Sequence, residues 1–334
     1  MIEEERVAAH LDSLAKPPGS LGRLEELAVR LAAIQGTLAP RTRPRRLFVF
    51  AGDHGVVADG VGIWPQDVTS AMLRVIASGR ASCSALAAIS DTPVELVDVG
   101  SKIAEPPVGP VYSDRRVARG TLSLASGPAM TAEQFWAAWT IGHDTIEAAR
   151  SDGVLVVALG EIGIGNTTSA ACLIALGCEV AADDVVGSGA GSTPESLERK
   201  RQVVCDAVTR ARSLVEADPV AAMASVAGFE IVAMAGAIAA ASHADMPVVL
   251  DGVVSGAAAI IAQAVDPAAL ETTIASHQSV EPAHRIALER LGLKPYLDWQ
   301  MRLGEGTGAL LMIPMLDAAA ALTANVATLK EVAG

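Results

Sequence analysis

Residues 154–171 have the sequence VLVVALGEIGIGNTTSAA, and this stretch decides the fold class. It begins with six apolar residues in a row, a pattern typical of a strand buried on both faces of a parallel sheet. Glycines follow at positions 160, 163 and 165, and Asn166-Thr167-Thr168 then leads into an alanine-rich segment with the composition of a helix. A buried strand that turns directly into a helix is the building unit of α/β folds. The stretch therefore predicts a parallel sheet with covering helices.

Three further apolar runs of this kind occur at residues 47–52, 93–100 and 247–252. Helix signals lie between the runs. Thr131 and Gln134 have the spacing of a capping box, and Thr193-Pro194 combines an N-cap residue with the proline favoured at the first helical position. This alternation predicts a Rossmann-like, doubly wound α/β fold with a mostly parallel sheet.

The two chain ends have a different pattern. Residues 2–15 and 21–34 have helical periodicity, and helices without strands follow from about residue 285. The segment 39–46, rich in proline and arginine, is expected to be a linker. We therefore predict a small helical domain built from residues 1–40 and 290–334, and a large α/β domain of residues 41–289.

The composition excludes several classes of partner. The chain has 334 residues and a formal charge of −13, which argues against nucleic acid or an anionic membrane. The acidic N-terminus lacks the basic and apolar regions of a signal peptide, and His243, Asp245 and Pro247 interrupt the most apolar stretch. The four cysteines have no zinc-site spacing and are expected to be buried thiols. We expect a cytoplasmic protein with no membrane partner.

Glycine-bearing turns follow all four strand candidates, at residues 52–55, 98–101, 160–168 and 251–256. Ligands of open parallel sheets gather beyond the carboxyl ends of the strands. In the 160–168 turn, converging backbone N–H groups and a helix N-terminus favour an anion such as a phosphate. A tight structural turn is the alternative. The chain has no Gly-x-Gly-x-x-Gly fingerprint at this turn and no P-loop, so neither a dinucleotide nor an ATP site is supported.

Other charged residues near these turns are candidates for the same site. Lys200 follows a second glycine loop at 185–195 and could reach a phosphate, although a solvated lysine is the simpler interpretation. Asp53 and His54 resemble a catalytic pair, but adjacent residues of a turn rarely face each other, and we interpret them as positioning residues. His277 and His284 lie seven residues apart with no third ligand pattern, so no metal site is predicted.

Glu305 is set between Gly304 and Gly306 at the start of an apolar helix. The helix N-terminus favours the charged carboxylate, and apolar surroundings favour the neutral acid. A group balanced in this way suits a general base near neutral pH. A helix-capping glutamate without chemistry is the alternative.

Taken together, these motifs resemble those of the nicotinate-nucleotide:dimethylbenzimidazole phosphoribosyltransferases of cobalamin biosynthesis. The resemblance runs from Lys16 to the last helix. The matching segments, in family order, are KPPGSLGRLEELA, GDHGV, GEIGIGNTT, the Lys200 helix, LDGVVSGAA, the Ser276-His277 pair and PYLDWQMRLGEGTGAL. The resemblance implies a homodimeric enzyme that moves the 5-phosphoribosyl group of nicotinate mononucleotide onto 5,6-dimethylbenzimidazole, with inversion and without a metal or cofactor.

The resemblance also implies roles for individual residues. Glu305 matches the catalytic base of the family. The residues expected to contact the substrates are Glu161, Gly163, Gly165, Asn166, Thr167, Thr168, Gly189, Lys200, Gly252, Ser276, Asp53, His54, Trp64, Met72 and Leu303. Trp64 and Met72 lie in the segment expected to line the base pocket, where some members carry smaller or polar residues.

Two alternatives remain open at this point. The acceptor could be another benzimidazole, a purine or a phenol, with the same glutamate as base. The chain could also be a non-catalytic nucleotide-binding protein on the same fold, although the intact RLGEGTGA segment weighs against this. An NAD-dependent oxidoreductase is excluded because the dinucleotide fingerprint is missing.

Overall fold

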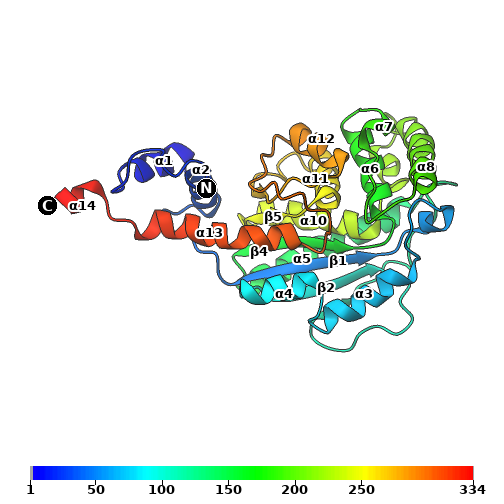
Figure 1. Ribbon diagram of the computed structural model, residues 1–334, viewed down its shortest axis with the longest axis horizontal. Helices are drawn as coiled ribbons and strands as arrows, with labels where there is room; N and C mark the ends of the chain where they lie inside the picture. The colour runs from blue at the N-terminus through cyan, green and yellow to red at the C-terminus, as the bar shows by residue number, and fades with distance from the viewer. Residues whose placement is uncertain (1–2, 334) are drawn as a thin grey trace.

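A computed structural model describes residues 3–333 and contains a six-stranded sheet in which every pairing is parallel (Figure 1). The strand order is β3-β2-β1-β4-β5-β6, as in doubly wound folds. Strands are added outward from β1 in one direction as far as β3, and from β4 onward they are added on the other side of β1. The strands are β1 (Arg45–Gly52), β2 (Val94–Gly100), β3 (Tyr112–Asp114), β4 (Val156–Ile162), β5 (Val248–Leu250) and β6 (Thr273–Ala275). The predicted fold class is therefore confirmed.

Alternate residues of the central strands face two separate cores. Phe48 and Phe50 of β1 belong to one hydrophobic cluster, whereas Leu47 and Val49 belong to the other. Both faces of β1 are buried, and for this reason its sequence is apolar without alternation.

Helices cover both faces of the sheet. The first cluster is completed by α5 (Ala132–Ser151), α6 (Asn166–Gly177), α7 (Ala182–Val185), α8 (Pro194–Arg212), α9 (Pro219–Ala224), α10 (Phe229–His243), α11 (Val253–Val265) and α12 (Pro282–Leu291). The second is completed by α1 (Glu4–Asp12), α2 (Arg23–Gln35), α3 (Asp67–Ala77), α4 (Ser82–Ile89) and α13 (Thr307–Asn325). A 3₁₀ helix, η1 (Gly55–Asp59), follows β1, and α14 (Leu329–Ala333) ends the described chain.

The two ends of the chain lie side by side at one end of the molecule (Figure 1). Leu14 forms a bridge with Thr328, and the Ala15 N–H donates to the Ala327 carbonyl at 2.8 Å. The helices α1 and α2 lie along the far half of α13, whose first half lies along the sheet, and α14 follows beyond the end of α13. Because a single hydrophobic cluster runs from these helices into the sheet, the division into two domains stays a prediction.

Two helical stretches of the described chain are apolar and long enough to span a membrane by composition alone. The first is α13, whose apolar side chains pack against α2, α4 and the sheet. The second, residues 67–89, is two helices separated by a turn in which Gly79 has φ 73°. Packing in the protein core accounts for the composition of α13.

The structure corrects three details of the sequence prediction. The short edge strands β3 and β6 were not predicted, because neither lies in a continuous apolar run like those that mark the other four strands. The predicted linker 39–46 overlaps the start of β1 at Arg45, whose guanidinium forms a 2.6 Å ion pair with Asp317 on α13. Cys205 is exposed and Cys178 is partly exposed, so only Cys83 and Cys172 are the expected buried thiols.

Candidate active site

One cavity opens beyond the carboxyl ends of β4 and β5, where the strand order predicts a ligand. Eleven of the predicted site residues line it, namely Trp64, Glu161, Gly163, Gly165, Asn166, Thr167, Thr168, Gly189, Lys200, Gly252 and Leu303. The other predicted residues, which are not among those that line it, are Asp53, His54, Met72, Ser276 and Glu305.

The glycine turn after β4 brings the N-terminus of α6 to the cavity. Gly165 caps α6 with φ 94°, and a Cβ on Gly163 would lie 2.2 Å from the Gly52 carbonyl oxygen of β1. Only glycine allows this approach of two backbones. The Ile164 N–H is bound by the Thr69 hydroxyl of α3 at 3.0 Å, so the turn is fixed from both neighbouring elements. The result is an ordered helix N-terminus that faces the cavity and suits an anion.

Lys200 lies beside this helix N-terminus. Its Nζ donates to the Thr167 hydroxyl and to the Gly187 carbonyl, each at 3.0 Å, and the residue is only 2% exposed. Burial lowers the pKa of Lys200 to about 8. The interpretation of Lys200 as a solvated surface lysine is therefore wrong.

Asp251, at the end of β5, holds the start of α13. Its Oδ1 accepts the N–H groups of Gly308 and Ala309 at 2.7 and 3.3 Å, and its Oδ2 accepts the Gly306 N–H at 3.1 Å. These bonds satisfy donors that a helix N-terminus leaves free. Burial nevertheless raises the pKa of Asp251 to about 7, against the opposing effect of the three N–H groups.

The Glu305 turn adopts left-handed backbone angles at three successive residues. Gly304, Glu305 and Gly306 have φ values of 89°, 59° and 76°. This conformation costs little for glycine but of order 1 kcal/mol or more for glutamate. The Glu305 N–H donates to the Glu161 carbonyl at 3.2 Å, and a Cβ on Gly160 would lie 2.5 Å from the Gly306 nitrogen. The flanking glycines are therefore required by the turn and by its contact with β4.

The Glu305 carboxylate is 3% exposed and faces the N-terminus of α4, where its Oε2 accepts the Cys83 N–H at 3.3 Å. Met72, on α3, packs against the hydrophobic cluster that contains Cys83. Glu305 and Met72 therefore lie on the α3–α4 side of the sheet, next to the lining residues Leu303 and Gly304, which directly precede Glu305 in the chain.

Glu161, at the end of β4, is one of two carboxyl groups among the described residues that line the cavity, together with Glu281. Its Oε2 accepts a hydrogen bond from the Asn166 amide at the start of α6, and its Oε1 lies against Gly304. Burial raises the pKa of Glu161 well above its ordinary value, and the nearby charges of Asp251, Glu230 and Glu305 raise it further. A cation bound in the cavity would offset this repulsion among carboxylates.

His54 forms a fully buried chain with residues of two helices. Its Nε2 lies 2.7 Å from Glu230 Oε1 on α10, and its Nδ1 lies 3.1 Å from the Ser169 hydroxyl on α6. Because all three side chains are at most 1% exposed, they hold the α6 turn from behind. The prediction that His54 is a positioning residue agrees with this geometry.

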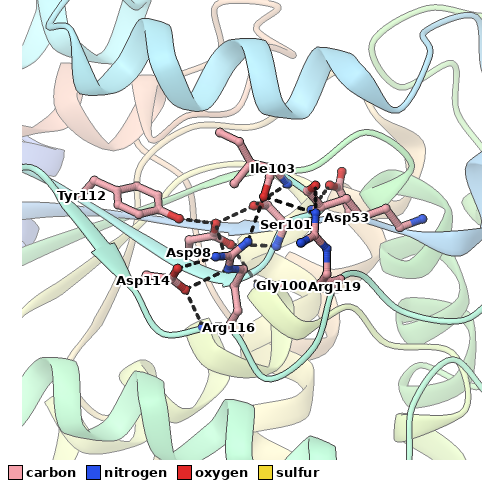
Figure 2. Close-up of polar contacts among 10 residues, drawn as sticks. Asp53, Asp98, Gly100, Ser101, Ile103, Tyr112, Asp114, Arg116 and Arg119 are labelled. Atoms are coloured by element: carbon pink, nitrogen blue, oxygen red, sulfur yellow. Dashed lines mark hydrogen bonds and ion pairs between the residues drawn. The ribbon is translucent and has the colours of Figure 1, made fainter. Parts of the chain in front are cut away.

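Asp53, the residue before His54, also holds neighbouring segments in place (Figure 2). Its carboxylate accepts the Lys102 N–H at 2.6 Å and the side-chain amide of Gln66, which immediately precedes α3. Burial raises the pKa of Asp53, and the Lys102 N–H opposes that shift. Figure 2 also shows Asp98 at the end of β2, where it binds the Ser101 N–H at 2.7 Å and the Tyr112 hydroxyl at 2.6 Å. These bonds fix the loops after β1 and β2.

The two histidines after β6 are packed together, with ring centroids 6.0 Å apart. Burial lowers the pKa of His277 to about 4 and that of His284 to about 3, so both rings are neutral at pH 7. Ser276 is fully buried beneath His277, which lines the cavity in its place. Within residues 3–333, no group of three or more His, Cys, Asp or Glu side chains is arranged to hold a metal ion.

Four further residues of the site were missed by the sequence analysis, namely Asp251, Glu230, Glu281 and Arg302. Asp251 had a usable signal, because it follows a buried strand and precedes a glycine. Glu230, Glu281 and Arg302 come from helix starts and a loop far away in sequence, and no local pattern marks them.

Replacement of Asp251 tests how the start of α13 is held. In Asp251→Asn the amide can still accept from Gly308 but offers an N–H₂ group to the Gly306 N–H. We expect exchange of the Gly306 amide proton, measured by NMR, to accelerate about tenfold or more, because a lost buried hydrogen bond costs roughly 1–3 kcal/mol. Asp251→Ala should accelerate exchange of the amide protons of Gly306, Gly308 and Ala309 together. The exposed Asp183→Asn, as control, should change the exchange of none of them. Unchanged protection in both Asp251 variants would refute the capping role.

Replacement of Glu161 tests the charge repulsion in the cavity. The pKa of Glu161 is higher in the folded than in the unfolded protein. The contribution of Glu161 to the free energy of unfolding is therefore complete below about pH 4, and it is lost as the pH rises through the pKa that Glu161 has in the folded protein. Urea unfolding of Glu161→Gln at pH 5 and pH 8 should therefore show the variant gaining stability relative to wild type at the higher pH. The exposed Glu198→Gln serves as the control. A difference that does not change with pH would contradict the assignment.

Comparisons with known proteins agree with this geometry. A family model described as phosphoribosyltransferase matches residues 3–333. The nicotinate-nucleotide–dimethylbenzimidazole phosphoribosyltransferase of Thermus thermophilus is 42% identical over 96% of this chain and 95% of its own length. That of Geobacter sulfurreducens is 40% identical over 97% and 91%. The crystal structure of CobT from Thermus thermophilus matches 99% of this chain and 98% of its own, with a TM-score of 0.92 at 41% identity. The chain therefore belongs to the family of nicotinate-nucleotide–dimethylbenzimidazole phosphoribosyltransferases.

Proposed function

We propose that this enzyme transfers the 5-phosphoribosyl group of nicotinate mononucleotide to 5,6-dimethylbenzimidazole, giving α-ribazole 5′-phosphate and nicotinate. The observation that supports this most strongly is the polarity of the cavity. One wall carries the α6 N-terminus and Lys200, and another carries Glu161 with the carboxyl groups of Asp251, Glu230 and Glu305 nearby. A donor with an anionic phosphate at one end and a cationic pyridinium at the other matches both walls.

The phosphate of the donor binds at the glycine turn in this proposal. The α6 N-terminus offers backbone N–H groups, and Lys200 supplies a buried ammonium next to Thr167. The negative charge of the whole protein disfavours an anion, so these local donors must provide the attraction.

The positive end of the donor then faces the carboxyl groups. The pKa of Glu161 is raised by burial and by the neighbouring carboxyl groups, so its ionisation is unfavourable. A pyridinium ring, and the oxocarbenium-like carbon that forms as it leaves, would restore the charged form and be stabilised by it. Interaction with a charge that develops during the reaction favours the transition state over the ground state.

Glu305 acts as the base in the second half of the reaction. The bond between ribose C1 and the pyridinium nitrogen breaks, and its electron pair stays with the departing nicotinate. The unprotonated nitrogen of the benzimidazole forms the new bond to C1 from the opposite face. Its other nitrogen carries a proton, which Glu305 accepts. This sequence gives inversion in a single displacement and requires neither a metal nor a cofactor.

The position of Glu305 suits this role. The Cys83 N–H at the start of α4 holds Oε2 of the carboxylate, and within residues 3–333 no hydrogen bond is made to Oε1, which leaves it available to the acceptor. The acceptor ring would lie between this carboxylate and the α3 segment that carries Met72, with Trp64 and Leu303 at the cavity mouth. Because Trp64 and Leu303 are 47% and 58% exposed, they could also admit a different acceptor, such as another benzimidazole, a purine or a phenol.

A homodimer and a cytoplasmic location are further parts of the proposal. The cavity mouth carries the exposed apolar side chains of Ile63, Trp64 and Leu303, with exposed Trp299 in the same segment as Leu303. Contact with a second copy would remove them from water and close the cavity. A cytoplasmic location fits substrates that are phosphorylated nucleotides, which do not cross membranes unaided.

Nicotinate release tests the function and the base together. With nicotinate mononucleotide and 5,6-dimethylbenzimidazole, we expect Glu305→Gln to lower kcat about 10²–10⁴-fold, the usual contribution of a positioned base. The exposed Glu198→Gln should retain the wild-type rate. Chromatography of parallel reactions with adenine and p-cresol would identify another acceptor. A near-wild-type rate in Glu305→Gln would refute the role of the base, and absence of release with every acceptor would favour the non-catalytic alternative.

A further inference from the structure

The glycine loop at 187–191 is held by three charged side chains from three different segments. Lys200 of α8 donates to the Gly187 carbonyl at 3.0 Å, and Arg302 donates to the Gly189 carbonyl at 3.2 Å. The third is Glu281, the residue before α12, whose Oε1 accepts the Gly189 N–H at 2.9 Å. All three charged residues line the cavity.

The other oxygen of Glu281 is placed close to the same loop. A Cβ on Gly187 would lie 2.2 Å from Glu281 Oε2, so a side chain at this position would displace the carboxylate. Likewise, a Cβ on Gly189 would lie 2.6 Å from the Thr167 hydroxyl and 3.6 Å from Lys200 Nζ. Glu281 and Lys200 therefore both contact this loop, and its glycines leave room for the carboxylate and the ammonium.

A buried carboxylate beside a phosphate-binding wall needs an explanation, because its charge repels the phosphate. Glu281 is 6% exposed, and its contact with the loop that also binds Lys200 supplies the explanation. We propose that Glu281 is a positioning residue for the donor phosphate: it fixes the 187–191 loop through Gly189 and keeps the buried Lys200 ammonium protonated. This inference rests on the proposed function insofar as the phosphate belongs to the nucleotide donor.

The charged surroundings of Lys200 agree with this role. Burial lowers the pKa of Lys200 to about 8, and the charge of Glu281 opposes that shift. The thiol of Cys172 on α6 faces the same ammonium, but burial raises its pKa to about 12 and leaves it neutral. Asp183 and Asp184 of α7 are exposed.

Three other titratable or charged residues face the cavity. His277, whose pKa burial lowers to about 4, is neutral near pH 8, and Arg302 carries the permanent charge of a guanidinium. Glu161 is the remaining group, and burial raises its pKa. Glu281 is therefore the carboxylate that both contacts the loop and favours the charged form of Lys200.

The test is the binding of ribose 5-phosphate, measured by calorimetry between pH 6 and pH 9. Glu281→Gln keeps an oxygen acceptor for the Gly189 N–H but loses the charge. If the pKa of Lys200 falls by about one unit, binding should weaken about fivefold at pH 8 and less than twofold at pH 6. Glu281→Ala also loses the loop bond and should weaken binding at both pH values. Glu281→Asp, which keeps the charge, should retain the wild-type pH profile.

Two controls separate this role from a general effect of charge or stability. The exposed Glu289→Gln on the same helix should bind like wild type. When Glu281→Gln is added to Lys200→Met, it should no longer weaken binding fivefold at pH 8, because the ammonium on which the Glu281 charge acts has been removed. A carboxylate that only repelled phosphate would give the opposite sign, with tighter binding in Glu281→Gln at every pH.

The outcomes also separate this inference from the proposed function. Wild-type binding with the predicted pH profile, but without nicotinate release, would refute the transfer reaction and support the role of Glu281. Unchanged or tighter binding in Glu281→Gln, or no Lys200-dependent binding in the wild type, would overturn the inference even if the transfer reaction is confirmed.

Discussion

The hydrogen bonds from the start of α13 to the Asp251 carboxylate are the interaction on which the site depends. They join the carboxyl end of β5 to Gly306, Gly308 and Ala309, and so fix where the long helix begins. The turn before the helix can then remain left-handed at three successive residues, pressed against Gly160 of β4. Because Asp251 and Gly160 fix the backbone on both sides of this turn, the side chain of Glu305 is buried and directed toward α4.

The same arrangement concentrates negative charge at one wall of the cavity. Asp251, Glu161 and Glu305 come from β5, β4 and the α13 turn, and burial makes the ionisation of the first two unfavourable. Stability alone would favour neutral residues at these positions. The opposite wall, with the α6 N-terminus and Lys200, is arranged for an anion. A substrate with a negative charge at one end and a positive charge at the other matches both walls at once.

The fold was predictable where the sequence carries a strong local pattern. The four apolar runs became strands. The capping box at Thr131 and the N-cap with its following proline at Thr193-Pro194 became the starts of α5 and α8. The three-residue strands β3 and β6 were not predictable because edge pairing depends on neighbours and not on local composition. Within the site, the glycine turn and Lys200 reach the cavity as expected. Glu281 and Glu230 could not be found in the sequence, because their partners lie 92 and 176 residues away.

The central claim is that Glu305, rather than Glu161, receives the proton of the acceptor. The most direct test is a crystal structure of the Glu305→Gln variant with nicotinate mononucleotide and 5,6-dimethylbenzimidazole bound. We expect the protonated ring nitrogen to lie within hydrogen-bond distance of residue 305, and the pyridinium ring to face Glu161. An acceptor ring whose N–H contacts Glu161, or that lies away from both side chains, would contradict the claim.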